Sequence, residues 1–338
     1  MCEVSPPFFL TPRASTPIIK GDCRDVLKDF PRETVDTCIT SPPYWNLRDY
    51  GTADWTGGDG DCDHRYYKGG HGEKSKVQTG SQGNQFYQYK GECKKCGAIR
   101  HDSQFGMEDN LDDYVSDLAD IMDDIRGILK PEGTLWLNIG DCYGGNNPVN
   151  QDGRRGFSNG PIVQRRKKYI DGLHPKNLMG IPWKIAFEMQ SRGWILRSDI
   201  IWHKPNPMPE SVKDRPTNAT EHIFLFSKNP LYYYDHKAIM EDAVTEDYSE
   251  EGKRNKRNVW KVRAAMYRGA HFATFPVELI TPCVIAGCPQ GGLVLDPFMG
   301  SGTVAYVAKK FGRNYTGVEL NPDYHKIIHE RTKQEELF

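Results

Sequence analysis

The strongest constraint on the fold is an alternation of apolar runs and amphipathic segments along the chain. Val35–Ile39 is an apolar run that ends in Ser-Pro-Pro, as expected of a buried strand where it leaves its sheet. From Leu111 to Leu129, apolar residues recur at three-and-four spacing with aspartates between them, which predicts an amphipathic helix. Lys130–Gly133 is predicted to stop this helix, and Thr134–Ile139 to form the next strand.

The same alternation continues to the other end of the chain. The predicted elements are a helix at Pro182–Arg192, strands at Trp194–Trp202 and His222–Phe226, a strand at Leu293–Asp296, a helix from Thr303 and a strand at Tyr315–Glu319. Strands that alternate with helices predict an α/β fold around a parallel sheet. Residues 51–105, 144–176 and 236–268 are polar and too long for ordinary connections, so we expect functional insertions there.

Composition narrows the class of protein. A chain of 338 residues is long enough for one large domain with insertions. The formal net charge of -1 gives no overall attraction to nucleic acid, so any DNA-binding surface must be local. No apolar stretch is long enough for a spanning helix and no signal peptide is evident, which predicts an intracellular protein without membrane contact. Nine cysteines favour reduced thiols with one metal site over a disulfide framework.

A glycine turn follows the strand that ends at Asp296. Gly300 and Gly302 would let the backbone approach a ligand closely, and the first amides of the next helix would face that ligand. Glu319 ends the following strand, where an acid binds ribose hydroxyls in nucleotide-binding α/β folds. The third glycine of the nicotinamide fingerprint is missing. The pattern therefore predicts a different nucleoside cofactor, the alternative being a structural turn and a surface Glu.

The sequence Thr-Ser-Pro-Pro-Tyr-Trp at residues 40–45 is the strongest chemical signal. The two prolines restrict the backbone and remove two N–H donors, which leaves carbonyl groups to point outward. An exocyclic amino group has two N–H donors, and the Ser41 hydroxyl and the Pro42 carbonyl could accept them. Tyr44 offers a ring face on which a base could stack. The alternative is an ordinary Pro-Pro turn that ends a strand beside a core aromatic residue.

Together, TSPPYW and the later DPFMGSGT closely resemble the amino-methylating DNA methyltransferases in their permuted, beta-type motif order. The resemblance covers roughly residues 18–50, 107–235 and 270–330. It implies an α/β, Rossmann-like S-adenosylmethionine-dependent methyltransferase sheet with polar insertions. The implied organisation is a catalytic part at 1–50 and 106–235, an insertion at 51–105, a target-recognition region at 206–270 and a cofactor-binding part at 271–338.

The resemblance also implies site residues and a reaction. A methyl group would pass from S-adenosyl-L-methionine to the exocyclic amino group of a base flipped out of double-stranded DNA. The residues expected at the target base are Ser41, Pro42, Pro43 and Tyr44. Asp22 is expected near the adenine of the cofactor, and Phe272 and Pro276 along its methionine part. The other expected cofactor residues are Asp296, Pro297, Phe298, Gly300, Ser301, Gly302, Thr303 and Glu319.

The choice of base depends on one residue. Ser41 at the first motif position favours cytosine N4 over adenine N6, although both acceptors serve either amine. No Cys nucleophile is needed for this chemistry, and Cys283 is predicted to be a core thiol. The alternatives are the same reaction on RNA, a DNA-binding relative without activity, and a nicotinamide-dependent oxidoreductase. A bacterial or phage-encoded cytoplasmic protein is expected. A restriction endonuclease partner, and the choice between monomer and homodimer, stay open.

Four residues of the polar insertion have the composition of a metal site. Cys-x-x-Cys-Gly is typical of a zinc knuckle, and a segment with so few aliphatic residues could not bury a core of its own. The predicted ligands of a structural zinc ion are Cys62, His64, Cys93 and Cys96, with His71 or His101 as substitutes for His64. The alternative is a flexible loop with incidental thiols.

Basic and aromatic residues alternate in the interval where the resemblance implies target recognition. Arg and Lys there could hold phosphates, although a charged run is more often a solvated face. The residues are Arg215, Lys253–Arg257, Trp260, Lys261, Arg263, Tyr267 and Arg268. Gln164–Lys168 is a further basic candidate, with a disordered surface loop as its rival.

Overall fold

The structure is a computed structural model, and the chain divides into two compact units. The larger comprises Met1–Leu47 with Glu108–Phe338, and the smaller is Arg48–Met107. The residues that the structure describes are 18–45, 54–67, 86–89, 91–101, 104–108, 110–144, 173–174, 176–243, 252–264 and 275–333. In those residues no helix is both long and apolar enough to cross a membrane.

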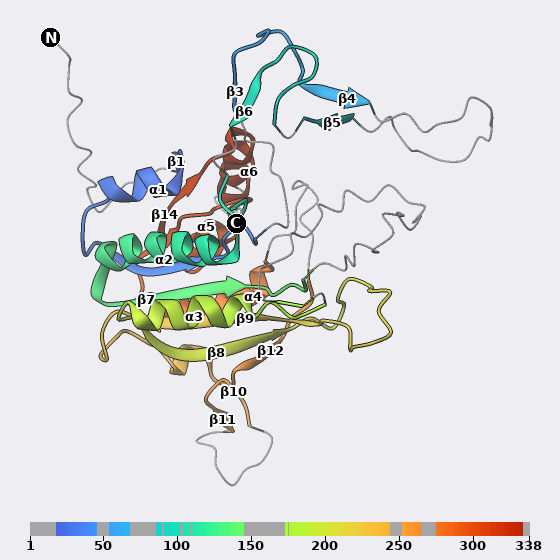
Figure 1. The fold of residues 1–338 in the computed structure, drawn as a ribbon. Coiled ribbons are helices and arrows are strands. Elements are labelled where there is room, and N and C mark those ends of the chain that lie inside the picture. The colour runs from blue at the N-terminus through green and yellow to red at the C-terminus, as the bar shows by residue number, and fades with distance from the viewer. Residues whose placement is uncertain are drawn as a thin grey trace, which may run out of the picture. The chain divides into compact units, whose positions relative to one another are not determined.

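The larger unit is built on an eight-stranded sheet in the order β1–β14–β13–β2–β7–β9–β8–β12 (Figure 1). β9 is antiparallel to both of its neighbours, whereas the other described pairs of this sheet are parallel. The strands are β1 (Ile18–Lys20), β2 (Val35–Thr40), β7 (Leu129–Ile139), β8 (Ile195–His203), β9 (Thr220–Ser227), β12 (Val259–Lys261), β13 (Leu293–Asp296) and β14 (Asn314–Glu319). The predicted α/β fold is confirmed.

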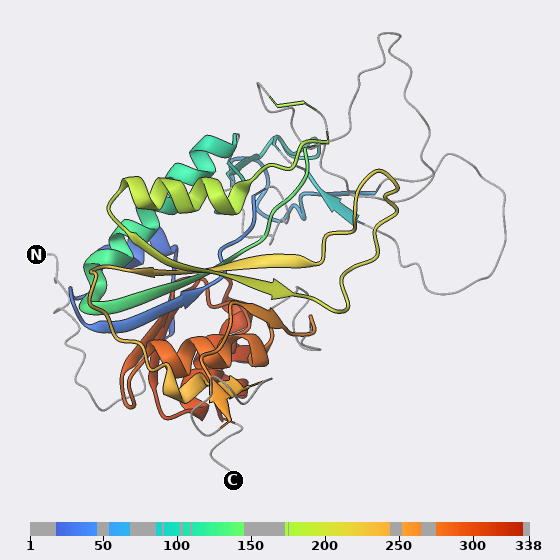
Figure 2. The same cartoon turned by 90° about the horizontal axis from the view of Figure 1, so that it is seen from below.

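Helices cover both faces of this sheet (Figure 2). One face has α2 (Leu111–Ile128) and α3 (Ile181–Ser191), and the other has α4 (Val277–Gly287), α5 (Thr303–Lys310) and α6 (Pro322–Lys333). The apolar stripe of α2 is buried, and the Asn110 side chain caps the helix by accepting the Asp113 amide at 2.8 Å. The short α1 (Cys23–Val26) and η1 (Leu27–Asp29) follow β1.

One predicted boundary is wrong. The helix does end before Lys130, as predicted, but the next strand, β7, begins at Leu129 and not at Thr134, so Lys130–Gly133 belongs to the strand. Lys130 is held by an ion pair with Asp36 at 2.7 Å, and the β2–β7 register shifts between Val35 and Thr37. Pro131 is tolerated there because it lies in this irregular part of the strand, between Leu129 and Thr134, where no residue of β2 is paired with it.

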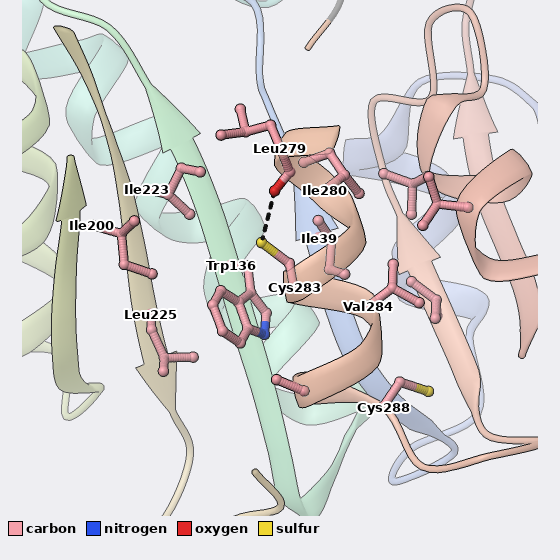
Figure 3. Packing of buried hydrophobic residues seen from close by; sticks show 14 of the residues in the cluster. Ile39, Trp136, Ile200, Ile223, Leu225, Leu279, Ile280, Cys283, Val284 and Cys288 are labelled. Atoms are coloured by element: carbon pink, nitrogen blue, oxygen red, sulfur yellow. Dashed lines mark hydrogen bonds between the residues drawn. The ribbon is translucent and has the colours of Figure 1, made fainter. Parts of the chain in front are cut away.

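One hydrophobic core cluster of the larger unit lies between α4 and the middle of the sheet (Figure 3). Leu279, Ile280 and Val284 of α4 pack against Ile39 of β2 and Trp136 of β7, and all five are at most 1% exposed. Cys283 lies in the same layer and is fully buried, with its Sγ 3.7 Å from the Leu279 carbonyl oxygen. Burial raises the pKa of the Cys283 thiol, so the prediction of an unreactive core cysteine is confirmed.

Part of the predicted target-recognition interval is in the catalytic sheet. β12 pairs in parallel with β8, and Trp260 at its centre is 5% exposed and donates to the Arg257 carbonyl. Trp260 is therefore a core residue, which corrects its grouping with the surface residues. The interval also contains η2 (Lys237–Ile239), β10 (Glu241–Asp242) and β11 (Lys253–Arg254), where β10 and β11 form a hairpin.

The smaller unit has two short antiparallel ribbons. β3 (Asp54–Thr56) pairs with β6 (Ile99–His101), and β4 (Arg65–Tyr67) pairs with β5 (Phe86–Gln88). Among its described residues, the buried apolar side chains are Cys93, Ala98 and Phe105. So few apolar groups cannot order such a segment by burial.

Candidate active site

The two sequence motifs meet at one edge of the sheet. β2 and β13 are parallel neighbours, so the carboxyl ends of both strands, Thr40 and Asp296, lie side by side. The Thr40 hydroxyl donates to Asp296 Oδ1 at 2.7 Å, and both side chains are buried. This hydrogen bond joins the beginning of the Ser-Pro-Pro-Tyr motif to the beginning of the glycine turn.

The glycine turn needs its glycines. Gly300 and Gly302 have φ values of 50° and 75°, in the left-handed region that disfavours other residues. A Cβ on Gly302 would also lie 2.8 Å from Ile328 of α6, so this turn has no room for a larger residue. Gly302 is the N-cap of α5, and the first amides of that helix face the sheet edge.

Two buried acids stand beside this turn. Glu319 ends β14 and accepts the Gly300 amide at 2.7 Å and the Asn321 amide at 2.8 Å. Asp296 accepts Thr40 and the Phe298 amide through Oδ1, while its buried Oδ2 has no hydrogen-bond partner among the described residues. Burial raises the pKa of Asp296 to about 7 and the pKa of Glu319 to about 7.

Two polar residues of the turn have structural partners. Arg331 of α6 is 8% exposed and donates to the Ser301 carbonyl and hydroxyl at 2.9 Å and 2.8 Å and to the Thr303 hydroxyl at 3.1 Å. The side chains of Ser301 and Thr303 thus anchor the turn to α6. Arg331 was not found from the sequence because it lies in a polar helix with no motif.

Three residues outside the glycine turn, Asp22, Phe272 and Pro276, were also predicted to contact the cofactor. Asp22 lies beyond the end of β1, at the same edge as Glu319, since Lys20 is paired with Glu319. The Asp22 side chain caps α1 and binds Arg24, with Nε–Oδ1 at 3.0 Å. Burial opposes its ionisation, but Arg24 holds the pKa of Asp22 below its ordinary value. Pro276 is the N-cap of α4, and Phe272 lies outside the described residues.

Tyr44 is held by side chains from other strands. Its hydroxyl donates to Glu221 Oε2 at 2.7 Å, and Asn138 Nδ2 donates to the same oxygen at 3.2 Å. Lys204, just after β8, forms an ion pair with the other Glu221 oxygen. Burial and the Glu221 charge raise the pKa of Tyr44 well above its ordinary value, so the phenol stays neutral.

The backbone near Tyr44 is equally restrictive. A Cβ on Gly140 would lie 2.7 Å from Tyr44 Cε2, so the ring packs directly against a glycine after β7. The Pro43 carbonyl accepts the Tyr114 hydroxyl of α2 at 3.0 Å, which leaves Ser41 and Pro42 as the acceptors proposed for a target amine. The Tyr44 ring, which the sequence motif predicted to be important, is thus held by Glu221 and Asn138, which no sequence motif identified.

Four of the described basic candidates are ion-paired. Arg254 and Arg257 both donate to Glu241, and Lys253 pairs with Asp242 at 2.5 Å. Arg215 pairs with Glu210, and its guanidinium lies 3.8 Å from the centroid of the Tyr143 ring. Ion pairs at the surface contribute little to stability. Tyr267, Arg268 and Gln164–Lys168 lie outside the described residues.

In the smaller unit the four predicted metal ligands converge. One donor atom from each of Cys62, His64, Cys93 and Cys96 lies within 4.8 Å of all the others. Of the two substitutes, His101 instead lies 2.7 Å from the Thr56 hydroxyl, and His71 is outside the described residues.

Comparison with known proteins identifies the family. The model of the N6/N4 DNA methylase family matches residues 35–330, which is most of the chain. The chain belongs to this family. It is therefore a DNA amino-methyltransferase, a class that includes enzymes acting on cytosine N4 and on adenine N6, and the predicted family is confirmed.

The chain is also similar in sequence to type II methyltransferases and in fold to solved methyltransferase structures. The chain is 40% identical to the type II methyltransferase M.SmaI of Serratia marcescens over 94% of this chain and 90% of that protein. It is 39% identical to M.Cfr9I of Citrobacter freundii over 94% and 88%. The fold matches the PvuII cytosine-N4-specific DNA methyltransferase with a TM-score of 0.58 at 17% identity, covering 94% and 86%. It also matches a Thermus thermophilus protein described as a DNA modification methylase, in complex with S-adenosyl-L-methionine, with a TM-score of 0.53 at 21% identity over 94% of each chain.

Proposed function

We propose that the chain methylates N4 of cytosine in double-stranded DNA with S-adenosyl-L-methionine as the donor. The observation behind the mechanism is the Thr40–Asp296 hydrogen bond, which places the base motif and the glycine turn at adjacent strand ends. The cofactor would supply a methyl group already activated by its sulfonium. A base stacked on Tyr44 would therefore need only to be positioned beside that methyl group.

The residues of the chain divide the binding of cofactor and base between them. Glu319 would accept the ribose hydroxyls, and Asp296 would face the positive charge of the cofactor with its unpartnered oxygen. The Ser41 hydroxyl and the Pro42 carbonyl would accept the two N–H groups of the target amine and so hold its nitrogen lone pair toward the methyl group. Because the methyl group is already activated, no metal ion is needed at this step.

Base flipping is part of the proposed reaction. A base inside a duplex cannot reach a site held by buried side chains, so the target must leave the stack. Tyr44 would supply the ring face for stacking, and the hydrogen bond from its hydroxyl to Glu221 would hold the ring in place.

The residues 206–270 are proposed to read the DNA around the target. A restriction endonuclease that recognises the same sequence is the proposed partner, and the bacterial cytoplasm is the proposed location, because relatives such as M.SmaI are bacterial type II methyltransferases.

The choice of cytosine rests on Ser41, and adenine N6 is the alternative. The experiment is mass spectrometry of nucleosides from DNA incubated with the protein and methyl-labelled S-adenosylmethionine. Label in N4-methylcytosine is expected. Label in N6-methyladenine would overturn the choice of base but keep the mechanism. Label only in RNA, or none on any DNA, would overturn the substrate or the activity and revive a DNA-binding relative without catalysis.

A further inference from the structure

Four soft donors are gathered in the smaller unit, and none of them belongs to the residues that the methyl transfer uses. They come from two segments, Cys62–His64 and Cys93–Cys96, separated by a long polar stretch of the sequence. All four donor atoms lie within 4.8 Å of one another, although no disulfide joins them. Thiols without a shared role have no reason to converge with an imidazole nitrogen at these distances.

The distances match the edges of a tetrahedron. A zinc ion with Zn–S bonds of about 2.3 Å and a Zn–N bond of about 2.0 Å requires S···S edges near 3.8 Å and S···N edges near 3.5 Å. Cys62 Sγ and Cys93 Sγ are 3.8 Å apart, and Cys96 Sγ is 3.6 Å from His64 Nδ1. These two of the six edges include all four residues and fit one ion at their centre, and the remaining pairs lie within 4.8 Å.

The backbone is shaped to present these donors. The Gly97 amide donates to the Cys93 carbonyl at 2.7 Å and the Cys93 amide donates to the Ala98 carbonyl at 2.8 Å, which folds Cys-x-x-Cys-Gly into a tight knuckle. Gly97 has a φ of 75°, which the turn requires. His64 has a φ of 48°, an uncommon value outside glycine, and its amide lies 3.5 Å from Cys62 Sγ. Amides that donate to ligand sulfurs are usual around metal-bound thiolates.

We propose that this cluster binds one structural zinc ion. Three thiolates and an imidazole are soft donors that suit zinc and do not suit magnesium or calcium, which prefer oxygen ligands. All four tetrahedral positions are filled by protein, so the site is closed and leaves no position for a substrate. The ligands are Cys62, His64, Cys93 and Cys96.

The ion supplies the order that the small unit cannot obtain from burial. Cys93 and Ala98 are among its few buried side chains, while the ribbon of β3 and β6 has only three residues in each strand. Binding would join the segment after β3 to the segment before β6 and thereby close the unit. The proposal is independent of the base that the enzyme methylates.

The first test is the metal content of the full-length protein, purified without added metal or chelator. Inductively coupled plasma mass spectrometry should find one zinc ion per chain in the wild-type protein. It should find none in the double variant Cys93→Ser/Cys96→Ser. Cys142→Ser is the matched control, because Cys142 is a half-buried thiol outside the cluster and its loss should leave the zinc in place. Zinc-free native protein, or full zinc in the double variant, would overturn the proposal.

The second test does not depend on a variant that folds. Zinc is removed from the wild-type protein with a chelator, and hydrogen exchange is followed in residues 54–67 and 91–101. Exchange there should rise at least about tenfold and return to its original rate with zinc but not with magnesium, because the metal supplies folding energy to this unit. Exchange that does not change on metal removal would overturn the structural role.

The third test is the coordination geometry. Cobalt in place of zinc should give the intense absorption of a tetrahedral thiolate complex, and a weak octahedral spectrum would overturn the geometry.

Discussion

The two halves of the proposed active site lie at one edge of the sheet but are built differently. At the proposed cofactor end, the backbone of a continuous segment from Leu293 to Thr303 forms a turn, and Glu319 of the next strand accepts a hydrogen bond from it. At the base end, Tyr44 is held by single side chains from β7, β9 and the end of β8. A site formed by the backbone comes from consecutive residues and can be recognised in the sequence. A site formed by side chains depends on which strands become neighbours in the fold.

This difference predicts that substitutions at the two ends separate cofactor binding from catalysis. The largest effect is expected for Glu319→Ala. Loss of two hydrogen bonds from ribose hydroxyls to a carboxylate, each typically worth about 1.5–3 kcal/mol, should weaken S-adenosylmethionine binding by at least about 100-fold. Isothermal titration calorimetry measures this effect. Glu278→Ala, an exposed glutamate on α4, is the matched control and should bind normally. Normal binding by Glu319→Ala would show that the acid has no ribose contact.

Tyr44→Ala should impair catalysis on DNA and leave the affinity for S-adenosylmethionine nearly unchanged. Stacking of a base on an aromatic ring is worth about 1–3 kcal/mol, so kcat/KM for DNA should fall by about 5-fold to 150-fold. Affinity for S-adenosylmethionine should stay within about twofold, because Tyr44 contacts Glu221 and Gly140 and not the glycine turn. Tyr232→Ala, which removes a tyrosine stacked on Arg197 at the surface, is the control. Equal losses of cofactor affinity and catalysis would contradict the division into two ends.

The anchoring of Tyr44 by Glu221 can be isolated with a double-mutant cycle. Tyr44→Phe keeps the ring and removes the hydroxyl, while Glu221→Gln keeps an acceptor and removes the charge beside Lys204. Each single variant should lose about 5-fold to 10-fold in kcat, which corresponds to about 1–1.4 kcal/mol, the net contribution of a typical hydrogen bond. The double variant should be no worse than Tyr44→Phe, since both changes remove the same interaction. Fully additive losses would show that Glu221 acts on something other than the Tyr44 hydroxyl.

The comparison also explains what could be predicted from the sequence. The helix and strand positions and both motifs were predictable, because hydrophobic periodicity and glycine or proline turns are local. The antiparallel β9 and the addition of β12 to the sheet were not, since strand order is a property of the whole fold. Asn138 and Glu221 are isolated polar residues on different strands, and only the pairing of β7 with β9 brings them together. The grouping of Cys62 with His64 and of Cys93 with Cys96 was predictable because each pair is only two or three residues apart.

The smallest expected effect is the pH dependence of apo-protein stability. Burial raises the pKa of Glu319 to about 7 in the folded state, above the ordinary value of a glutamate. The folded protein then binds more protons than the unfolded chain between these two pKa values, so this group stabilises the fold at low pH and loses that contribution as pH rises through 7. The pKa of Asp296 is raised in the same direction, mainly by burial, and the nearby Glu319 charge contributes to that shift.

Glu319→Gln removes one of these two titrations and keeps the shape of the side chain. Relative to the variant, the melting temperature of the wild-type apo-protein should fall by roughly 2–6 °C between about pH 5.5 and pH 8. Differential scanning calorimetry without cofactor measures the two curves. Parallel curves for the two proteins would mean that Glu319 is already ionised in the apo-protein, stabilised by the Gly300 and Asn321 amides. In that case the cofactor end would be organised for its ligand before binding, as the side-chain network already organises Tyr44 at the base end.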